Sequence, residues 1–274
     1  MDTYIIDSIR TPIGNFGGTL KDIRTDDLAA IPIRELIKRT KIEPSKIDDV
    51  ILGCANQAGE DNRNIARMAS LLAGVPFSVP GETINRLCAS GMSAIINAHR
   101  AINAGDGNLF IAGGIENMTR GPWVISKVSK AFGRDAQMFD SSFGWRFINP
   151  KMKELYGVDG MGTTAENLAE KYNISREDQD NFAYHSQLKA YKAQSSGRLS
   201  EEIVPVEIPQ RKKEPILFEH DEFIKGNTKV EVLAKLRTAF KKEGGTVTAG
   251  NSSGLNDGAA AMLLASENGV EENN

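Results

Sequence analysis

The first 115 residues of this chain alternate short β-forming runs with stretches of helical spacing, and this alternation constrains the fold more than any other feature. The β-forming runs occur at 4–6, 50–53, 82–85 and 109–112. Strands that are separated by helices at this spacing typically share one layered sheet, and a largely parallel arrangement is favoured. The sequence therefore predicts an α/β fold.

The helical stretches between these runs are expected at about 26–39, 64–73 and 88–104, and Gly105 stands where a left-handed cap would end the third stretch. Pro32 lies inside the first stretch, where a proline is tolerated only near the first turn of a helix. The third stretch has apolar residues at a spacing of three and four positions and a second face of small residues. A helix that is apolar nearly all round is expected to be buried.

The character of the chain changes between residues 118 and 245, a segment that holds both Trp residues and most of the Lys and Arg residues. An amphipathic helix is expected to open at Ser175, because an acid, Asp178, follows three residues later and completes a capping pattern. The chain is therefore divided into a first part at 1–117, an inserted domain at 118–245 and a return to the alternating pattern at 246–274, which ends in a buried strand.

Charge and hydropathy exclude several kinds of partner. The net charge of −3 gives the chain as a whole no attraction to nucleic acid or to anionic lipid. The longest apolar run, 259–265, is too short to span a membrane, and the amino terminus has no apolar segment typical of a secretion signal. A cytoplasmic location is therefore expected, and Cys54 and Cys88 are expected to be free thiols there.

Cys88 lies in the segment 85–91, Asn-Arg-Leu-Cys-Ala-Ser-Gly, between a predicted strand and a predicted helix. The amino end of a helix carries partial positive charge and unpaired N–H groups, which favour a thiolate and can stabilise an oxyanion. A nucleophilic cysteine and a buried structural cysteine fit this position equally well. Cys54, at the end of an earlier strand, is expected to be a small core residue.

A second candidate is the loop 248–261, in which Gly, Ser and Asn dominate before an apolar strand. Such a loop can present backbone groups and a hydroxyl to a ligand, although a tight surface turn is the better interpretation of the loop alone. A paired glycine at 113–114 matches no dinucleotide or phosphate-loop motif. His99 is expected in a core, His185 and His220 are expected in solvent, and no residue spacing predicts a metal site.

Taken together, these segments resemble the thiolase family, and the resemblance runs through nearly the whole chain. Residues 10–14 resemble the family's opening strand and turn, and residues 85–91 resemble its nucleophile motif. Residues 113–118 resemble a conserved strand exit, and residues 161–167 resemble the segment that contacts the pantetheine arm. Residues 233–237 and 249–261 together resemble the coenzyme A loop. The resemblance implies a thiolase-type layered α/β fold: a mixed sheet with a buried helix, built as a first half-fold plus an inserted loop domain.

The resemblance also implies an enzyme, an acyl-CoA C-acyltransferase that forms or cleaves 3-oxoacyl-CoA, in which Cys88 carries the acyl group. The residues expected to contact substrate or coenzyme A are Met161, Lys225, Ala249, Ser253 and Gly254. Coenzyme A thioesters would be substrates, with no separate cofactor and no metal. Family members are dimers or tetramers, so a homodimer or homotetramer is expected for the full-length protein.

Some positions depart from the family pattern. Gly160 stands where many biosynthetic members carry a histidine, and Lys225 stands where some members carry an arginine near the adenine. The segment 143–150 is more similar to degradative 3-oxoacyl-CoA or 3-oxoadipyl-CoA thiolases than to enzymes that make acetoacetyl-CoA.

The family's second half-fold supplies a Gly-His-Pro histidine that activates the nucleophile and a Cys-x-Gly cysteine that moves the α-proton, and neither motif occurs in this chain. We therefore expect a truncated amino-terminal part with little turnover of its own. The alternative is a natural short paralogue that binds coenzyme A or assists assembly without catalysis. A ketoacyl synthase relative, loaded from acyl carrier protein, is disfavoured by the opening Arg-Thr-Pro and the Ala-Gly-Asn loop.

Overall fold

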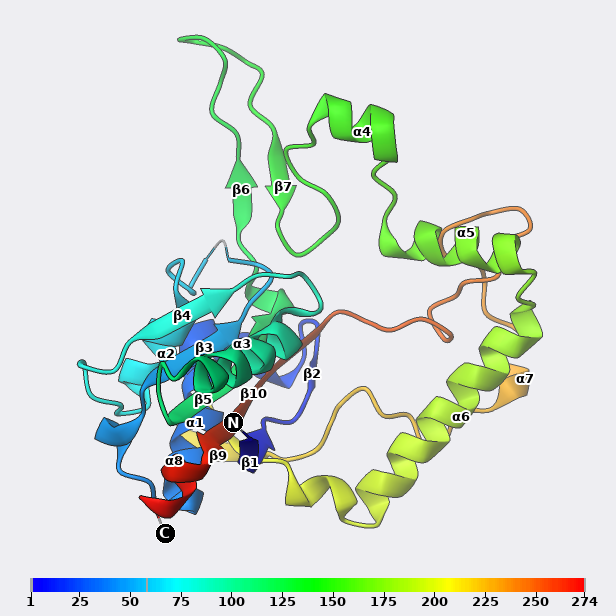
Figure 1. Cartoon of the computed structure of the whole chain (residues 1–274). Helices are drawn as coiled ribbons and strands as arrows, with labels where there is room; N and C mark the ends of the chain where they lie inside the picture. The colour runs from blue at the N-terminus through cyan, green and yellow to red at the C-terminus, as the bar shows by residue number, and fades with distance from the viewer. Residues whose placement is uncertain (1, 58, 274) are drawn as a thin grey trace. The chain divides into compact units, whose positions relative to one another are not determined.

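The computed structural model describes residues 2–57 and 59–273, which form two compact units (Figure 1). Unit 1 comprises Met1–Gly121, Leu199–Glu222 and Asn256–Asn274. Unit 2 comprises Pro122–Arg198 and Phe223–Leu255. The bounds of these units differ from the domain division expected from the sequence, because 199–222 cluster with unit 1 and 246–255 cluster with unit 2.

Unit 1 is built around a six-stranded sheet in the order β1-β10-β5-β3-β4, with β2 paired to β10. Its strands are β1 (Thr3–Arg10), β2 (Gly14–Asn15), β3 (Asp49–Gly53), β4 (Gly81–Ile84), β5 (Leu109–Asn117) and β10 (Asn256–Ser266), with a separate hairpin of β8 (Val206–Gln210) and β9 (Lys213–Phe218). Its helices are α1 (Thr25–Thr40), α2 (Ile65–Leu72), α3 (Ser90–Ala104) and α8 (Glu267–Glu271). The strands and helices predicted within the first 115 residues are therefore confirmed.

The sheet is mixed, as the resemblance implies, and it is also largely parallel, as the alternation predicts, because β1, β2, β3, β4 and β5 run in one direction and β10 runs against them. β3 is parallel to β4 and β5, because a helix carries the chain back between successive strands and each strand enters at the same edge. β10 is antiparallel to all three strands that it pairs with, β1, β2 and β5. The chain reaches β10 only after passing through unit 2, so no helical crossover dictates the direction of this strand.

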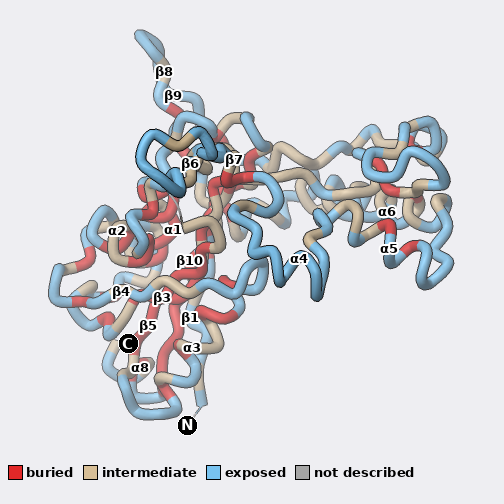
Figure 2. Tube along the Cα trace, turned by 90° about the horizontal axis from the view of Figure 1, so that it is seen from above, coloured by how far each residue is buried: buried red, intermediate tan, exposed pale blue. Residues whose placement is uncertain are grey.

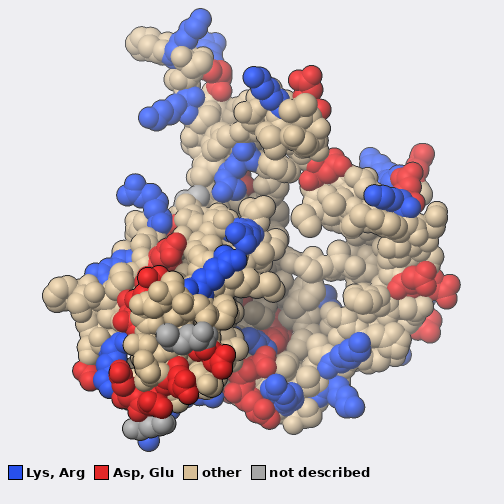
Figure 3. All heavy atoms as spheres, in the orientation of Figure 1, with Lys and Arg blue, Asp and Glu red and all other residues tan. Residues whose placement is uncertain are grey.

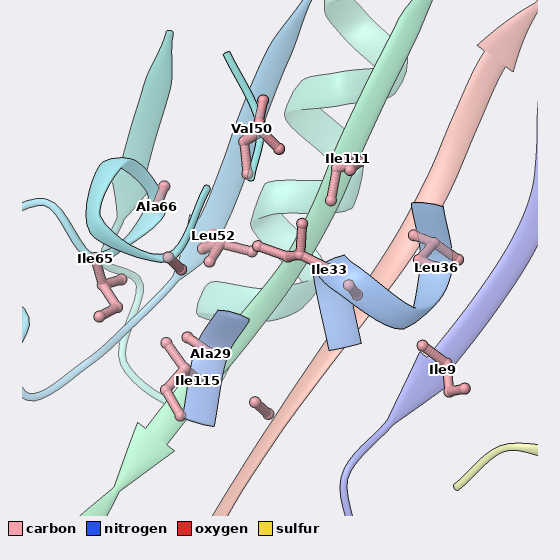
Figure 4. Packing of buried hydrophobic residues seen from close by; sticks show 14 of the residues in the cluster. Ile9, Ala29, Ile33, Leu36, Val50, Leu52, Ile65, Ala66, Ile111 and Ile115 are labelled. Carbon is pink, nitrogen blue, oxygen red and sulfur yellow. The ribbon is translucent and has the colours of Figure 1, made fainter. Parts of the chain in front are cut away.

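Alternate side chains of each strand point to opposite faces of the sheet, and each face is covered by helices. Figure 4 shows one face, where Leu52 and Ile111 of the sheet lie against Ile33 of α1. On the other face Phe110 pairs with Ala98 of α3 in a second apolar cluster. A fully buried Leu or Ile side chain contributes about 2 kcal/mol, so these two layers supply most of the stability of unit 1.

Pro32 lies in the middle of α1 and is buried, and the helix continues through it to Thr40. The expectation that a proline here would be tolerated only near the first turn is therefore wrong. A proline inside a helix costs about 3 kcal/mol, because it removes one backbone hydrogen bond and crowds the preceding turn. α1 packs on α2 and on the sheet, and that burial offsets the local cost.

The helix α3 covers the second face of the sheet with its small residues. Ala94, Ala98 and Ile102 are fully buried, whereas Met92 is 68% exposed on another side of the helix. Gly105 ends the helix in the left-handed conformation with φ 82°, as the sequence predicts. The burial of α3 is thus confined to the face that packs on the sheet.

Unit 2 contains the helices α4 (Pro150–Tyr156), α5 (Met161–Tyr172), α6 (Arg176–Ser195) and α7 (Val230–Leu233), and a hairpin of β6 (Trp123–Ile125) and β7 (Met138–Asp140). The predicted cap of α6 is confirmed, since the Ser175 hydroxyl accepts a hydrogen bond from the Asp178 N–H at 3.0 Å. The segment 246–248 forms no regular strand, and Thr248 makes an isolated bridge with Thr238. No helix among the described residues is both long and apolar enough to cross a membrane.

Candidate active site

Cys88 lies on a tight loop directly before α3, and its side chain is exposed. Leu87 adopts the left-handed conformation with φ 50°. The Ser90 hydroxyl closes this loop, because it donates to the Leu87 carbonyl at 2.6 Å and accepts from the Arg86 N–H at 2.8 Å. Cys88 is thereby held at the amino end of α3, where backbone N–H groups concentrate partial positive charge.

Glycines in the sheet allow the first turn of α3 to approach the strands closely. A Cβ atom added at Gly53 of β3 would collide with the backbone of Ser90 and Gly91. The same atom at Gly114 of β5 would lie 3.5 Å from the Gly91 Cα. Gly53 and Gly114 are therefore part of the surface on which the Cys88 loop is seated.

A series of hydrogen bonds links the loop that carries Cys88 to the end of β5. Both side-chain groups of Asn85 are used: the amide N–H donates to the Ala55 carbonyl at 2.9 Å, and the amide oxygen accepts from the Leu87 N–H at 2.9 Å. The Glu116 carboxylate accepts from the backbone N–H groups of Ala55 at 2.9 Å and Asn56 at 3.2 Å. Burial raises the pKa of Glu116, while these two hydrogen bonds oppose the rise.

The two cysteines of unit 1 differ sharply in environment. Cys54 is 2% exposed, and burial, together with the nearby carboxylates of Glu116 and Asp61, raises its pKa to about 12. It is a neutral core residue, as expected. Cys88 is exposed, and no side chain of the described residues hydrogen-bonds its sulfur. Chemistry at a thiol of this chain therefore falls to Cys88.

In unit 2 the candidate coenzyme A loop is held by buried polar groups. Glu166 of α5 is 5% exposed, and its carboxylate accepts from the N–H groups of Thr246 and Val247 at 2.9 Å each. Burial opposes ionisation, but the hydrogen bonds from Val247 and Thr246 prevail and lower the pKa of Glu166. This carboxylate fixes where the loop begins.

A second clamp acts inside the loop. The Asn251 amide oxygen accepts from the Thr248 N–H at 2.7 Å, and its N–H group donates to Asp180 of α6 at 2.9 Å. Asp180 is 1% exposed and pairs with Arg176 at 2.8 Å. Ala249 lies exposed at the turn that this network creates.

Two of the predicted binding residues lie near one aromatic ring of unit 2. The Lys225 ammonium lies 5.4 Å from the centre of the Phe223 ring, and a Cβ added at Gly254 would meet the same ring at 2.8 Å. Met161 is 80% exposed at the start of α5, next to Gly162, which packs on Phe240. Phe223 thus brings Lys225 and Gly254 together.

Ser253, the fifth predicted binding residue, is exposed, and its hydroxyl donates to the Gly254 carbonyl at 3.1 Å. Cys88 belongs to unit 1, whereas the predicted binding residues Met161, Lys225, Ala249, Ser253 and Gly254 all belong to unit 2. Within residues 2–57 and 59–273, no group of three or more His, Cys, Asp or Glu side chains is placed to hold a metal ion.

A separate hollow of unit 1 is a poor candidate for the coenzyme A site. It is lined by four acidic residues, Asp48, Asp49, Glu82 and Asp106, with Arg100 as the basic residue of its lining. Figure 3 shows Asp and Glu side chains gathered on the part of unit 1 near α8. A surface of this charge repels the phosphates of coenzyme A.

The roles of two site residues, Glu116 and Glu166, were not predicted from the sequence, and the predicted burial of His99 is wrong. Glu116 and Glu166 both lie inside recognised motifs, but nothing in the pattern says that their carboxylates clamp loops distant in sequence. The sequence signal for the role of Glu116 is its place two residues after the paired glycine, near the end of a strand. His99 is exposed rather than in a core, because it lies one position beyond the inward-facing Ala98, and it contacts the Thr3 hydroxyl at 2.8 Å.

Comparison with known proteins agrees with this geometry. The family model of the thiolase N-terminal domain matches residues 3–268. The 3-oxoadipyl-CoA/3-oxo-5,6-dehydrosuberyl-CoA thiolase of Escherichia coli is 57% identical over 267 residues, which are 97% of this chain and 66% of that protein. A β-ketoadipyl-CoA thiolase of Acinetobacter baylyi is 56% identical over 270 residues, which are 98% of this chain and 67% of that protein.

A solved structure supports the same assignment. The crystal structure of human mitochondrial 3-ketoacyl-CoA thiolase in complex with CoA superimposes with a TM-score of 0.87 at 35% identity, and the match covers 98% of this chain and 66% of that one. The chain thus spans about two thirds of the length of the relatives that it matches. From its N-terminal-domain match, its close relatives and its mixed sheet, this chain belongs to the thiolase family.

Proposed function

We propose that this chain carries the nucleophile of a thiolase, an acyl-CoA C-acyltransferase, and that Cys88 holds the acyl group as a thioester. The contrast between the two cysteines supports this proposal most directly. Cys88 is exposed before the first turn of α3, whereas Cys54 is buried and its pKa is raised to about 12. A thiol must ionise and meet its substrate in order to act as a nucleophile.

In the proposed cleavage reaction, the Cys88 thiolate attacks the 3-oxo carbon of a 3-oxoacyl-CoA. The bond between that carbon and the α-carbon then breaks, its electron pair passes to the α-carbon, and uptake of a proton there yields acetyl-CoA. Free coenzyme A attacks the acyl-cysteine as a thiolate, which releases the shortened acyl-CoA and restores Cys88. Bond formation follows the same steps in reverse.

The proposed substrates are 3-oxoacyl-CoA thioesters whose acyl chain ends in a carboxylate. The support is that the relatives named above, at 56–57% identity, act on 3-oxoadipyl-CoA according to their names. The segment 143–150 also resembles that group of enzymes. No cofactor or metal is proposed in addition to the coenzyme A thioester.

The proposed coenzyme A contacts are those of unit 2. Lys225 offers an exposed ammonium group for a phosphate, and the Ser253 hydroxyl and the backbone at Ala249 and Gly254 offer polar groups for the pantetheine arm. Replacing Lys225 by Met is expected to weaken coenzyme A binding about tenfold, as measured by calorimetry. Lys229→Met removes an equally exposed ammonium four residues away and serves as the matched control.

The step at the α-carbon requires a base of matched pKa, and Cys88 has no hydrogen-bonded base among the described residues. We therefore expect this chain to accept an acyl group faster than it completes turnover.

A homodimer or homotetramer remains the expected assembly, and a cytoplasmic location remains a prediction.

Mass spectrometry after incubation with acetyl-CoA tests the proposal. The expected result is a gain of one acetyl group on the peptide that contains Cys88, with no gain in Cys88→Ser and an undiminished gain in Cys54→Ser. Coenzyme A binding without acylation would favour the alternative of a binding or assembly partner. Normal thiolysis of acetoacetyl-CoA by this chain would contradict the expected lack of turnover.

A further inference from the structure

We propose that Glu116 is a positioning residue for Cys88, acting through the loop 54–56 and the side chain of Asn85. The inference rests on the proposed function of Cys88 as nucleophile. It concerns residues of unit 1 alone, which are linked by an unbroken series of hydrogen bonds.

The series begins at the end of β5. Glu116 precedes the last residue of that strand, and its carboxylate accepts from two successive backbone N–H groups, those of Ala55 and Asn56. Two N–H groups that share one carboxylate are held more rigidly than a loop that is bonded to water. The Cys54 N–H also donates to the Ile84 carbonyl at 3.1 Å, so this loop is tied to the end of β4 as well.

The series continues from Ala55 to the nucleophile loop. Glu116 holds the N–H group of Ala55, and Asn85 holds its carbonyl group at 2.9 Å. The Asn85 side chain is thereby oriented so that its oxygen accepts from Leu87, the residue before Cys88. Every hydrogen bond between the carboxylate and the nucleophile loop lies between 2.9 and 3.2 Å.

The backbone at Leu87 makes this series matter for the thiol. A non-glycine residue in the left-handed conformation costs about 1 kcal/mol and persists only when its surroundings hold it. The Ser90 hydroxyl closes the loop locally, but it does not attach the loop to β3 or β5. Asn85 supplies that attachment, and Asn85 in turn depends on the placement of Ala55 by Glu116.

A purely structural role for Glu116 predicts something different. In that case its replacement would lower the free energy of unfolding, while Cys88 in the folded molecules would react as before. A positioning role predicts that the reactivity of Cys88 changes in fully folded protein, because the sulfur shifts relative to the positive end of α3.

The test measures the rate at which iodoacetamide alkylates Cys88 in the folded chain, alongside the urea unfolding midpoint. Glu116→Gln keeps the shape of the side chain but sets an NH₂ group against an N–H donor, and the alkylation rate is expected to fall about tenfold. Glu116→Asp keeps both carboxylate oxygens and should restore part of the rate. Glu82→Gln, an exposed acid on β4, is the matched control and should leave the rate unchanged.

Asn85→Ala provides a second variant that leaves the carboxylate in place. It should slow alkylation as much as Glu116→Gln, and the double variant should be no slower than either single variant, because both changes break one series. Equal alkylation rates in wild type and both variants would overturn the proposal, and so would strictly additive effects. If alkylation is slowed in the variants but neither wild type nor any variant takes up an acetyl group, the positioning role is supported and the proposed function is overturned instead.

Discussion

Units 1 and 2 bury different kinds of residue. Unit 1 holds both apolar clusters, one on each face of its sheet. The buried residues of unit 2 are largely polar: Ser141, Ser142, Glu166, Asp180 and Thr248, beside Ala169, Leu233 and Val247. Figure 2 shows the same contrast, with red concentrated on β3, β5, β10 and α1 and pale blue covering most of α4.

The contrast teaches that the two candidate sites are positioned by different forces. The seat of Cys88 is set by close packing of α3 on a glycine-lined sheet, whereas the candidate coenzyme A loop is set by hydrogen bonds to the carboxylates of Glu166 and Asp180. Packing responds to changes in volume, and ionised hydrogen bonds respond to pH and to the loss of a charge.

The largest expected effect is that of Gly53→Ala in unit 1. The new methyl group collides with the backbone of Ser90 and Gly91, so α3 must move, at a cost of about 3 kcal/mol. Urea unfolding followed by circular dichroism measures this loss. Gly160→Ala in unit 2 is the control, since its Cβ meets nothing within 4 Å, and it should change stability by less than about 0.5 kcal/mol. Equal losses in both variants would break the comparison.

The second largest expected effect is the stabilisation of unit 1 by the ionised Glu60. The Arg120 guanidinium, with help from the Thr25 N–H and Arg24, lowers the pKa of Glu60 to about 2 against the effect of burial. Because this pKa is depressed, the stabilisation is complete above about pH 4.5 and is lost as pH falls towards 2, with a total of about 3 kcal/mol. Glu60→Gln should flatten the stability profile in that window.

A pH titration of unfolding checks this prediction in wild type and variant. Glu116 contributes with the opposite sign, because its raised pKa makes its contribution fall as pH rises through the folded value. A variant curve that is as steep as the wild-type curve below pH 4.5 would assign the acid sensitivity to other carboxylates.

In unit 2, Glu166→Gln should loosen the candidate coenzyme A loop by about 1–2 kcal/mol, because a neutral amide accepts less strongly from Thr246 and Val247. Hydrogen exchange of the amides at 246–251 should accelerate, while that of β3 and β5 stays protected. Since the pKa of Glu166 is lowered, acid should produce the same loosening in wild type as pH falls below about 4.5. Unchanged exchange in the loop would show that other contacts hold it.

The smallest effect is that of Lys241→Met, which removes the ion pair with Glu170 at 3.0 Å. Both side chains are largely exposed, so the loss should stay below about 0.5 kcal/mol and should vanish at high salt. A larger loss in urea unfolding would mean that unit 2 depends on surface charge as well as on its buried clamps.

Local patterns in the sequence predicted much of unit 1. The runs at 50–53 and 109–112, the strand–helix junction at Cys88 and the cap at Gly105 all depend on residues close in sequence, and all are confirmed. The direction of β10 was not predictable from alternation, because it depends on pairing with strands more than a hundred residues away. Pro32 was misjudged because tertiary burial outweighed a local rule.

The candidate sites were predictable as segments but not as networks. Cys88, Met161 and Ser253 were identified from motifs, and their roles remain proposals. The clamps made by Glu116 and Glu166 join segments 60 to 81 positions apart, and no periodicity encodes such a pairing. The position of Cys88 in the sequence fitted a nucleophilic and a buried structural cysteine equally well, and its exposure in the structure contradicts the buried one.

The placement of β10 between β1 and β5 has a consequence for biosynthesis. On the ribosome, β5 is complete at Asn117, but the strand that fills the gap beside it begins only at Asn256. Until then the nascent chain holds two open strand edges, which invite association with other chains. Folding of the sheet is therefore expected to wait until residues 256–266 have been made and to be slow, and holding chaperones should improve the yield of the folded chain.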